Sequence, residues 1–159
     1  VALEAGIAVG TLYDYFPSKA ALQSGYVRHC IETLLHAVDE QAVLPLDLSW
    51  RERLHRLVQL ACGVGRPALS WFHSDMLALE PQVAEPKHQQ RAHQELAAMW
   101  QRVFDACTDL PRRPSAETVL ALHLAVWGGR RYAMLLRLDA AQMQRWAAEM
   151  ERLVCDAVQ

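Results

Sequence analysis

Apolar residues recur at helical spacing along almost the whole chain. Between residues 18 and 41 they fall at steps of four, which predicts one long amphipathic helix. No stretch alternates apolar and polar residues in the way a half-buried strand does. The pattern therefore predicts an all-α helical bundle, with further helices starting after Ser49 and spanning about residues 67–79, 87–107, 116–137 and 140 onward.

Polar residues stand where these helices are expected to begin. Ser18 and Ser115 are natural N-caps, because their hydroxyls accept from backbone N–H groups of the first turn. Ser49 is followed three residues later by Glu52, and Asp139 by Gln142, so both positions predict a capping box.

The first residues carry a different pattern. Good helix formers precede Gly6, which suits the left-handed end of a helix. Two helical turns fit residues 9–16, and Pro17 stops them. A helix, a short turn and a short helix form the helix-turn-helix arrangement, whose exposed hydroxyls and aromatic rings can contact phosphates and base edges. A tight corner between two helices of an ordinary helical protein explains the same pattern.

Residues 6–22 read Gly-Ile-Ala-Val-Gly-Thr-Leu-Tyr-Asp-Tyr-Phe-Pro-Ser-Lys-Ala-Ala-Leu. This segment resembles the recognition segment of the TetR (tetracycline repressor) family of transcriptional regulators. It departs from the family pattern at Ala8, where Ser is usual, at Val9, which is often polar or basic, and at Ala20, where Glu is usual. The positions that match are Gly10, Thr11, Leu12, Tyr13, Tyr15, Phe16, Ser18, Lys19 and Leu22.

The resemblance implies a domain organisation and a function. Residues 1–17 are expected to be the remainder of a helix-turn-helix domain, and residues 18–159 a helical domain for ligand binding and dimerisation. The protein is then a cytoplasmic, ligand-responsive regulator, a repressor that a small molecule releases from a palindromic double-stranded operator. Two recognition helices of a dimer enter major grooves about 34–36 Å apart. DNA contacts are expected from Val9, Gly10, Thr11, Tyr13, Tyr15 and Lys19, whereas Leu12 and Phe16 seat the helix.

The resemblance also implies a homodimer formed through the last two helices. Independently, residues 119–129 are apolar nearly all round, so the helix that contains them needs cover on more than one side. Gly128 and Gly129 suggest a close backbone approach or a bend. Burial of both apolar stripes within one chain is the alternative. The predicted interface residues are Val119, His123, Val126, Trp127, Met143, Trp146 and Met150.

The middle helices hold many Trp, Met and His residues, which suits a mostly apolar pocket with a few polar groups. Ordinary core packing accounts for each of them individually. A partly apolar small-molecule effector is the ligand such a pocket implies. The candidate lining residues are Trp71, Phe72, His73, Met76, Met99, Trp100, Phe104, His123 and Trp127.

Composition and charge narrow the class of protein to which the chain can belong. The chain has 159 residues, of which 52% are hydrophobic and 21% charged, so a folded globular protein is expected. No apolar run is long enough for a membrane span. The net charge of −2 provides no basic footprint for DNA. Because the chain opens inside a helix without Met, we expect preceding residues to complete the helix-turn-helix.

Enzymatic motifs are missing from the sequence. There is no Gly-rich phosphate loop, no nucleophile elbow and no His-Glu-x-x-His, so we predict a protein that is not an enzyme and has no cofactor. The seven histidines form no spacing typical of a metal site, and no metal is predicted. The four cysteines are expected to be buried thiols, with redox sensing as the alternative. A helical ligand- or protein-binding module that never contacts DNA remains the second functional reading.

Overall fold

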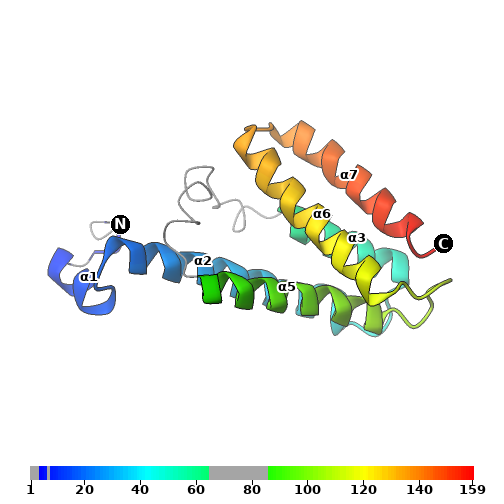
Figure 1. The fold of residues 1–159 in the computed structure, drawn as a ribbon, viewed down its shortest axis with the longest axis horizontal. Coiled ribbons are helices and arrows are strands. Elements are labelled where there is room, and N and C mark those ends of the chain that lie inside the picture. The colour runs from blue at the N-terminus through cyan, green and yellow to red at the C-terminus, as the bar shows by residue number, and fades with distance from the viewer. Residues whose placement is uncertain (1–3, 7, 65–85) are drawn as a thin grey trace.

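The structure is a computed structural model, and it describes residues 4–6, 8–64 and 86–159. Throughout these residues every regular element is helical, which confirms the all-α prediction (Figure 1). The helix predicted over about residues 67–79 lies outside the described residues. The elements are α1 (Val9–Tyr15), α2 (Lys19–Val38), the π-helix η1 (Asp39–Val43), α3 (Trp50–Cys62), α5 (Pro86–Ala106), α6 (Ala116–Leu135) and α7 (Ala140–Asp156).

The predicted caps set the starts of these helices. The hydroxyl of Ser18 accepts from the N–H of Ala21 at 3.0 Å, and the carboxylate of Asp139 forms a full capping box with Gln142. Ser115 caps α6 in the same way. At α3 only half of the predicted box forms, because the Glu52 carboxylate pairs with Arg56 one turn further on.

The helix predicted over residues 18–41 changes geometry before its end. After Val38 the backbone continues as the π-helical turn η1. The buried guanidinium of Arg53, on α3, donates to the carbonyls of Ala42 at 2.7 Å and Val43 at 3.0 Å. A π-turn leaves carbonyl groups without their usual helical partners, and Arg53 supplies donors to them. The sequence pattern identified the helix but not this turn.

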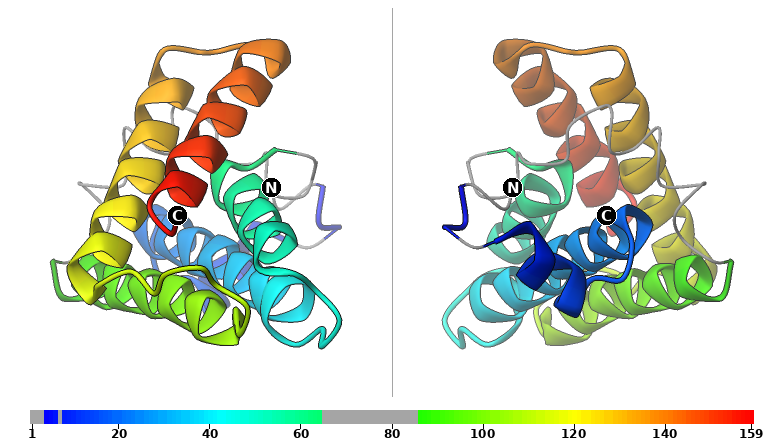
Figure 2. Two further views of the ribbon diagram at one scale, coloured as in Figure 1. Left: turned by 90° about the vertical axis from the view of Figure 1, so that its right-hand side faces the viewer. Right: turned by 90° about the vertical axis from the view of Figure 1, so that its left-hand side faces the viewer.

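The body of the molecule has α2 and α5 lying side by side and α6 and α7 forming an antiparallel pair, with α3 packed between them (Figures 1 and 2). α3 contacts α2, α5, α6 and α7, so it is the central element of the described core. Its Leu54, Leu57 and Val58 are fully buried. The largest buried side chains of α5 are Trp100 and Phe104.

The glycine pair in α6 has two different environments. A Cβ atom on Gly129 would lie 2.7 Å from Cζ2 of Trp146 on α7, closer than packed carbon atoms approach. The close approach predicted from the glycine pair is therefore confirmed at Gly129. Gly128 has nothing within 4 Å of its Cβ position, so its backbone faces open space.

The N-terminal end of the molecule stands apart from this body. α1 contains no buried residue, and the first buried residue of α2 is Val27. Figure 1 shows α1 at the end of α2 that lies away from α6 and α7. The fold thus presents α1 and the first two turns of α2 as a protruding end, which we call the N-terminal tip (residues 8–26).

Candidate nucleic-acid interface and ligand site

Local backbone geometry positions α1. Gly6 has φ +67°, the left-handed conformation that only glycine adopts without strain, as its position predicts. Ala8 occupies the N-cap and provides no side-chain hydrogen bond to the first turn. At the other end, the N–H of Phe16 donates to the Leu12 carbonyl and closes the short helix. α1 is therefore a two-turn helix without a side-chain cap. The turn at Gly6 before it and the hydrogen bond of Phe16 after it set its bounds.

Phe16 connects α1 to α2. Its ring lies so close to Gly25 that a Cβ there would be 3.0 Å from Phe16 Cε1. Leu12 and Phe16 are the half-buried side chains of the segment, and the rest of α1 is exposed. This matches the seating role that the sequence assigned to them. Glycine at position 25 permits the close approach of the ring.

The opposite face of α1 is open to solvent. Tyr13 is 55% exposed, Tyr15 77% and Val9 61%. Gly10, Thr11 and Lys19 are exposed as well. The hydroxyls of the two tyrosines and of Thr11 can donate to phosphate oxygens, and the Lys19 ammonium adds a positive charge. All six predicted DNA-contacting residues therefore lie on accessible surface at the N-terminal tip.

Comparison with protein families identifies a similarity at this end of the chain. The model of bacterial regulatory proteins of the tetR family matches residues 1–24. The N-terminal segment is therefore similar to the N-terminal part of tetR family regulators. This family comprises DNA-binding transcription regulators. No curated protein matches the chain.

The match to the family model runs past Pro17 into the first turns of α2, so it includes Lys19 and ends one residue before Gly25. The departure at Ala8 has a visible consequence, since α1 lacks a side-chain cap. Loss of such a cap costs about 1 kcal/mol of helix stability.

Part of the predicted effector-contacting set comes together in the body. The ring of His123 lies 6.3 Å from that of Trp100 and 6.5 Å from that of Trp127, centroid to centroid. Phe104 and Met99 are buried beside Trp100. These residues form a continuous aromatic cluster of α5 and α6. The other predicted members, Trp71, Phe72, His73 and Met76, lie outside the described residues.

His123 is the unusual member of this cluster. Its side chain is 1% exposed, and its Nε2 atom has no hydrogen-bond partner. Burial disfavours the charged imidazolium and lowers the pKa of His123 to about 4, with a further contribution from the neighbouring His93. His123 is therefore a neutral imidazole at physiological pH, surrounded by aromatic rings.

The predicted dimer-interface residues mostly face their own chain. Val119, His123 and Val126 are buried, and Trp127, Trp146 and Met150 pack against the core of the same chain. Met143 is half-buried. Burial removes Val119, His123 and Val126 from the surface that a second copy could contact, whereas the half-buried Trp127, Met143, Trp146 and Met150 keep part of their side chains accessible. The apolar surface that α6 exposes is a different face, which carries Leu120, Leu124, Tyr132 and Leu135.

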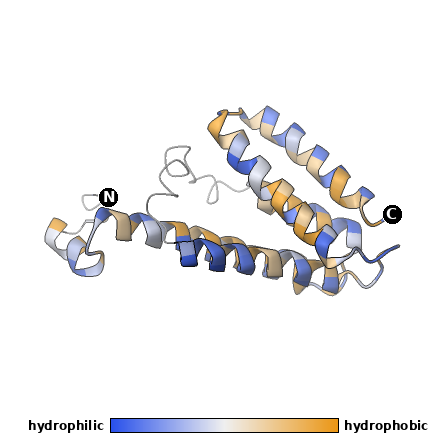
Figure 3. Ribbon diagram, in the orientation of Figure 1, coloured by the Kyte–Doolittle hydropathy of each residue, from blue (hydrophilic) through white to orange (hydrophobic). Residues whose placement is uncertain are grey.

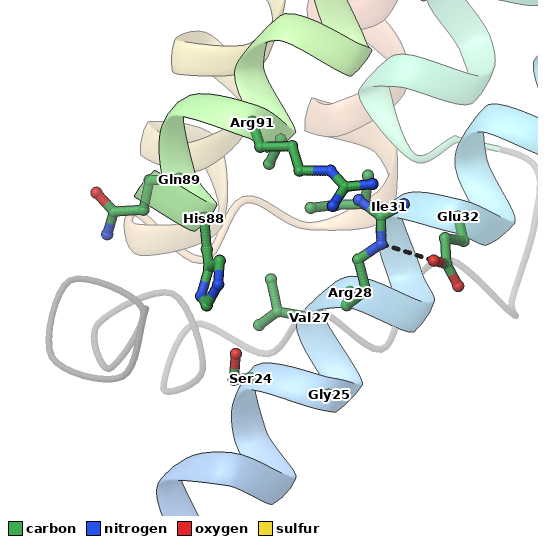
Figure 4. A pocket seen from close by; sticks show the side chains of 10 residues that line it. Ser24, Gly25, Val27, Arg28, Ile31, Glu32, His88, Gln89 and Arg91 are labelled. Carbon is green, nitrogen blue, oxygen red and sulfur yellow. Dashed lines mark hydrogen bonds and ion pairs between the residues drawn. The ribbon is translucent and has the colours of Figure 1, made fainter. Parts of the chain in front are cut away.

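A cavity of about 430 Å³ lies between α2 and α5, close to the N-terminal tip (Figure 4). Sequence reasoning missed it, and none of the predicted effector-contacting residues that the structure describes, Met99, Trp100, Phe104, His123 and Trp127, lines it. The two i,i+4 pairs Arg28–Glu32 and Arg91–Glu95 were the available signal, but nothing in the sequence places α2 beside α5. The lining residues are Ser24, Gly25, Val27, Arg28, Ile31, Glu32, His88, Gln89, Arg91 and Ala92.

The cysteines are free and mostly buried. Desolvation raises the pKa of Cys62 to about 12 and of Cys107 to about 11, so these thiols stay protonated at neutral pH. In the described part of the chain, no three His, Cys, Asp or Glu side chains gather as metal ligands would. Among the same residues, no helix has the length and apolar character to cross a membrane.

Proposed function

We propose that this protein is a ligand-responsive transcriptional repressor, in which a homodimer binds a palindromic operator through α1 and releases it when a small molecule binds the helical body. The observation that carries the proposal is the accessible face of α1, which lies in the segment that matches the tetR family. Tyr13, Tyr15, Thr11 and Lys19 provide the donors for DNA, and Gly10 lets the backbone approach a phosphate.

The test of DNA binding is a selection of duplexes from a random pool with the intact protein, followed by anisotropy titrations on the enriched sequence. We expect an inverted repeat with half-sites about one helical turn apart. Lys19→Ala should weaken binding across all sequences and reduce the slope of log affinity against log salt by about 1. Arg145→Ala, at an exposed residue of α7 far from α1 (Figure 1), is the matched charge control and should leave both values unchanged.

Failure to enrich any sequence, together with no retention of DNA even at low salt, would refute the DNA-binding proposal. It would favour a helical binding module that does not read DNA, which the net charge of −2 permits.

The homodimer is proposed from the exposed apolar face of α6. Leu124 is 51% exposed and Leu120 is 47% exposed, one helical turn apart, and Tyr132 continues the same side of the helix at 68%. Ala121, Ala125 and Gly128 lie between them and leave the backbone accessible. Figure 3 shows apolar residues along much of α6. A face with large side chains flanking small ones suits a twofold contact between identical helices.

Light scattering of two variants tests this interface. Leu124→Glu places a charge in the proposed contact and should convert the dimer to a monomer. Leu46→Glu, at a loop residue that is 92% exposed, adds the same charge away from α6 and should leave the dimer intact. A dimer that survives Leu124→Glu, or a wild-type protein that is monomeric, contradicts the proposal.

A further inference from the structure

The cavity between α2 and α5 combines an apolar wall with an uneven set of charges. Val27, Ile31 and Ala92 provide the apolar wall. At one end the guanidinium groups of Arg28, from α2, and Arg91, from α5, come together (Figure 4). Ser24 and His88 provide polar groups at the other end. The site is built for a small molecule that has both an apolar part and a polar head.

The hydrogen bonds at the arginine end leave donors available. Glu95 accepts from Arg28 and, at 2.9 Å, from Nε of Arg91. Arg28 also donates to Glu32 at 2.6 Å. The two arginines hold the pKa of Glu95 below its usual range, so its carboxylate is charged. Each guanidinium carries five N–H donors, and Arg91 places only Nε on Glu95 while its side chain is 71% exposed.

The charges favour an anion over a cation. An incoming cation must separate Glu95 from two arginines or Glu32 from Arg28. An incoming carboxylate can accept from the N–H groups of Arg91 that Glu95 does not use, in the bidentate geometry that guanidinium and carboxylate share. We propose that this cavity is the effector site of the repressor and binds a small organic carboxylate, whose apolar part lies on Val27 and Ile31. This inference rests on the proposed function for the consequence of binding.

The cavity is connected directly to the DNA-facing helix. Gly25 lines the cavity on one side and contacts the Phe16 ring on the other. The pair of Arg28 with Glu95 joins α2 to α5 next to Val27, where the buried part of α2 begins. A carboxylate that draws Arg28 and Arg91 away from Glu95 weakens this connection. Binding therefore changes the position of the N-terminal tip and lowers operator affinity.

Calorimetric titration with a defined series tests the ligand class. The probes are butanoate, benzoate and 2-naphthoate, with benzamide and 2-naphthamide as neutral counterparts. We expect the aromatic carboxylates to bind at millimolar concentration or below and the amides to bind at least about tenfold more weakly, because they lack the charge-assisted pair. Arg91→Gln should reduce carboxylate affinity at least about tenfold. Arg152→Gln, which removes an arginine that is 59% exposed and its two ion pairs from α7, should leave affinity unchanged.

The proposal is overturned if no carboxylate binds, if the amides bind equally well, or if Arg91→Gln leaves the affinity unchanged. Operator titrations on the same samples separate the two proposals. Operator binding without carboxylate binding refutes the proposed carboxylate site and leaves the proposed repressor function intact. Carboxylate binding without operator binding refutes the repressor function and leaves the carboxylate site intact.

A variant tests the connection to DNA binding without any ligand. Glu95→Gln keeps the size of the side chain but loses the charge that pairs with both arginines. It should lower operator affinity several-fold in the absence of carboxylate, as the ligand does. Glu149→Gln, which breaks an exposed pair with Arg152 on α7, is the control. Unchanged operator affinity in Glu95→Gln shows that the pair does not transmit binding.

Discussion

The two halves of α2 have opposite characters. Residues 19–26 contain no buried side chain, whereas residues 27–38 bury Val27, Cys30, Ile31, Leu34, Ala37 and Val38. One continuous helix thus belongs half to the N-terminal tip and half to the body. The difference shows where the free energy of folding comes from: the body buries large side chains, and the tip derives its order from the helix that continues into it.

This division agrees with the contacts proposed for each region. A surface that reads DNA must keep its hydroxyls, rings and charges accessible, so it cannot also bury them. Tyr13 and Tyr15 are exposed, as such a surface requires, and among the described residues 8–17 Leu12 and Phe16 are the half-buried ones. The body, by contrast, can pack Trp100 and Phe104 to near-complete burial. Changes in the two regions should therefore have separable effects on stability and on DNA binding.

The largest expected effect comes from the body. Trp100→Ala removes a side chain that is 1% exposed and leaves a cavity, which should lower the free energy of unfolding by about 4 kcal/mol. Tyr15→Ala, in the N-terminal tip, should change it by less than about 0.5 kcal/mol and weaken DNA binding instead. Urea unfolding and DNA titrations of both variants measure the contrast. Equal destabilisation by the two substitutions would abolish the distinction between tip and body.

The next effect is the pH dependence that His123 confers on the body. Its pKa is lowered to about 4, so between about pH 6.5 and 4 the unfolded chain binds a proton that the folded chain does not. Stability is therefore complete above pH 6.5 and falls by about 3 kcal/mol as the pH drops to 4. Urea unfolding across this range measures the slope, which His123→Leu should remove.

His36→Leu is the control for this prediction, because His36 is exposed on α2 and its removal should leave most of the pH dependence in place. A His123→Leu protein that loses stability with acid as steeply as the wild type would show that other groups cause the acid sensitivity.

The smallest effect compares two helix caps. Ser18→Ala and Ser115→Ala each remove one hydroxyl that accepts from the first turn, at about 1 kcal/mol. Ser18 caps α2 in the tip, so its loss should speed hydrogen exchange at the start of α2 and leave the global melting temperature nearly unchanged. Ser115 caps α6 in the body, so its loss should lower the melting temperature. A fall in melting temperature of the same size in both variants would show that the tip unfolds together with the body.

Much of the fold could be predicted because it depends on local chemistry. The caps at Ser18, Ser115 and Asp139 are interactions within one helical turn, and the sequence contains both partners. The left-handed backbone at Gly6 and the close approach at Gly129 follow from residue type in the same way. The accessible face of α1 followed from the spacing of its hydroxyls.

The candidate ligand site could not be predicted, because it depends on pairs distant in sequence. Arg28 and Glu95 are 67 residues apart, and their contact exists only because α2 and α5 lie side by side. The faces of α6 posed a similar problem: a helix that is apolar all round does not show which side its own chain covers. Val119 and Val126 proved to be buried, and Leu120 and Leu124 exposed. The turn at η1 was missed for the same reason. The carbonyl groups of Ala42 and Val43 in η1 are bonded by Arg53, which lies in α3.

The π-helical turn η1 fixes the C-terminal end of α2, the end that lies away from α1 (Figure 1). Arg53 holds η1 to α3, and Arg102 of α5 holds Asp39 at 2.9 Å, so this end is anchored on two sides. The 20 residues of α2 extend about 30 Å from that anchor to the start of the helix. A rotation of about 6° at the anchor therefore displaces α1 by about 3 Å. In the homodimer proposed above, two outward displacements would change the separation of the two α1 helices by about 6 Å, which is large compared with a groove repeat of about 34 Å.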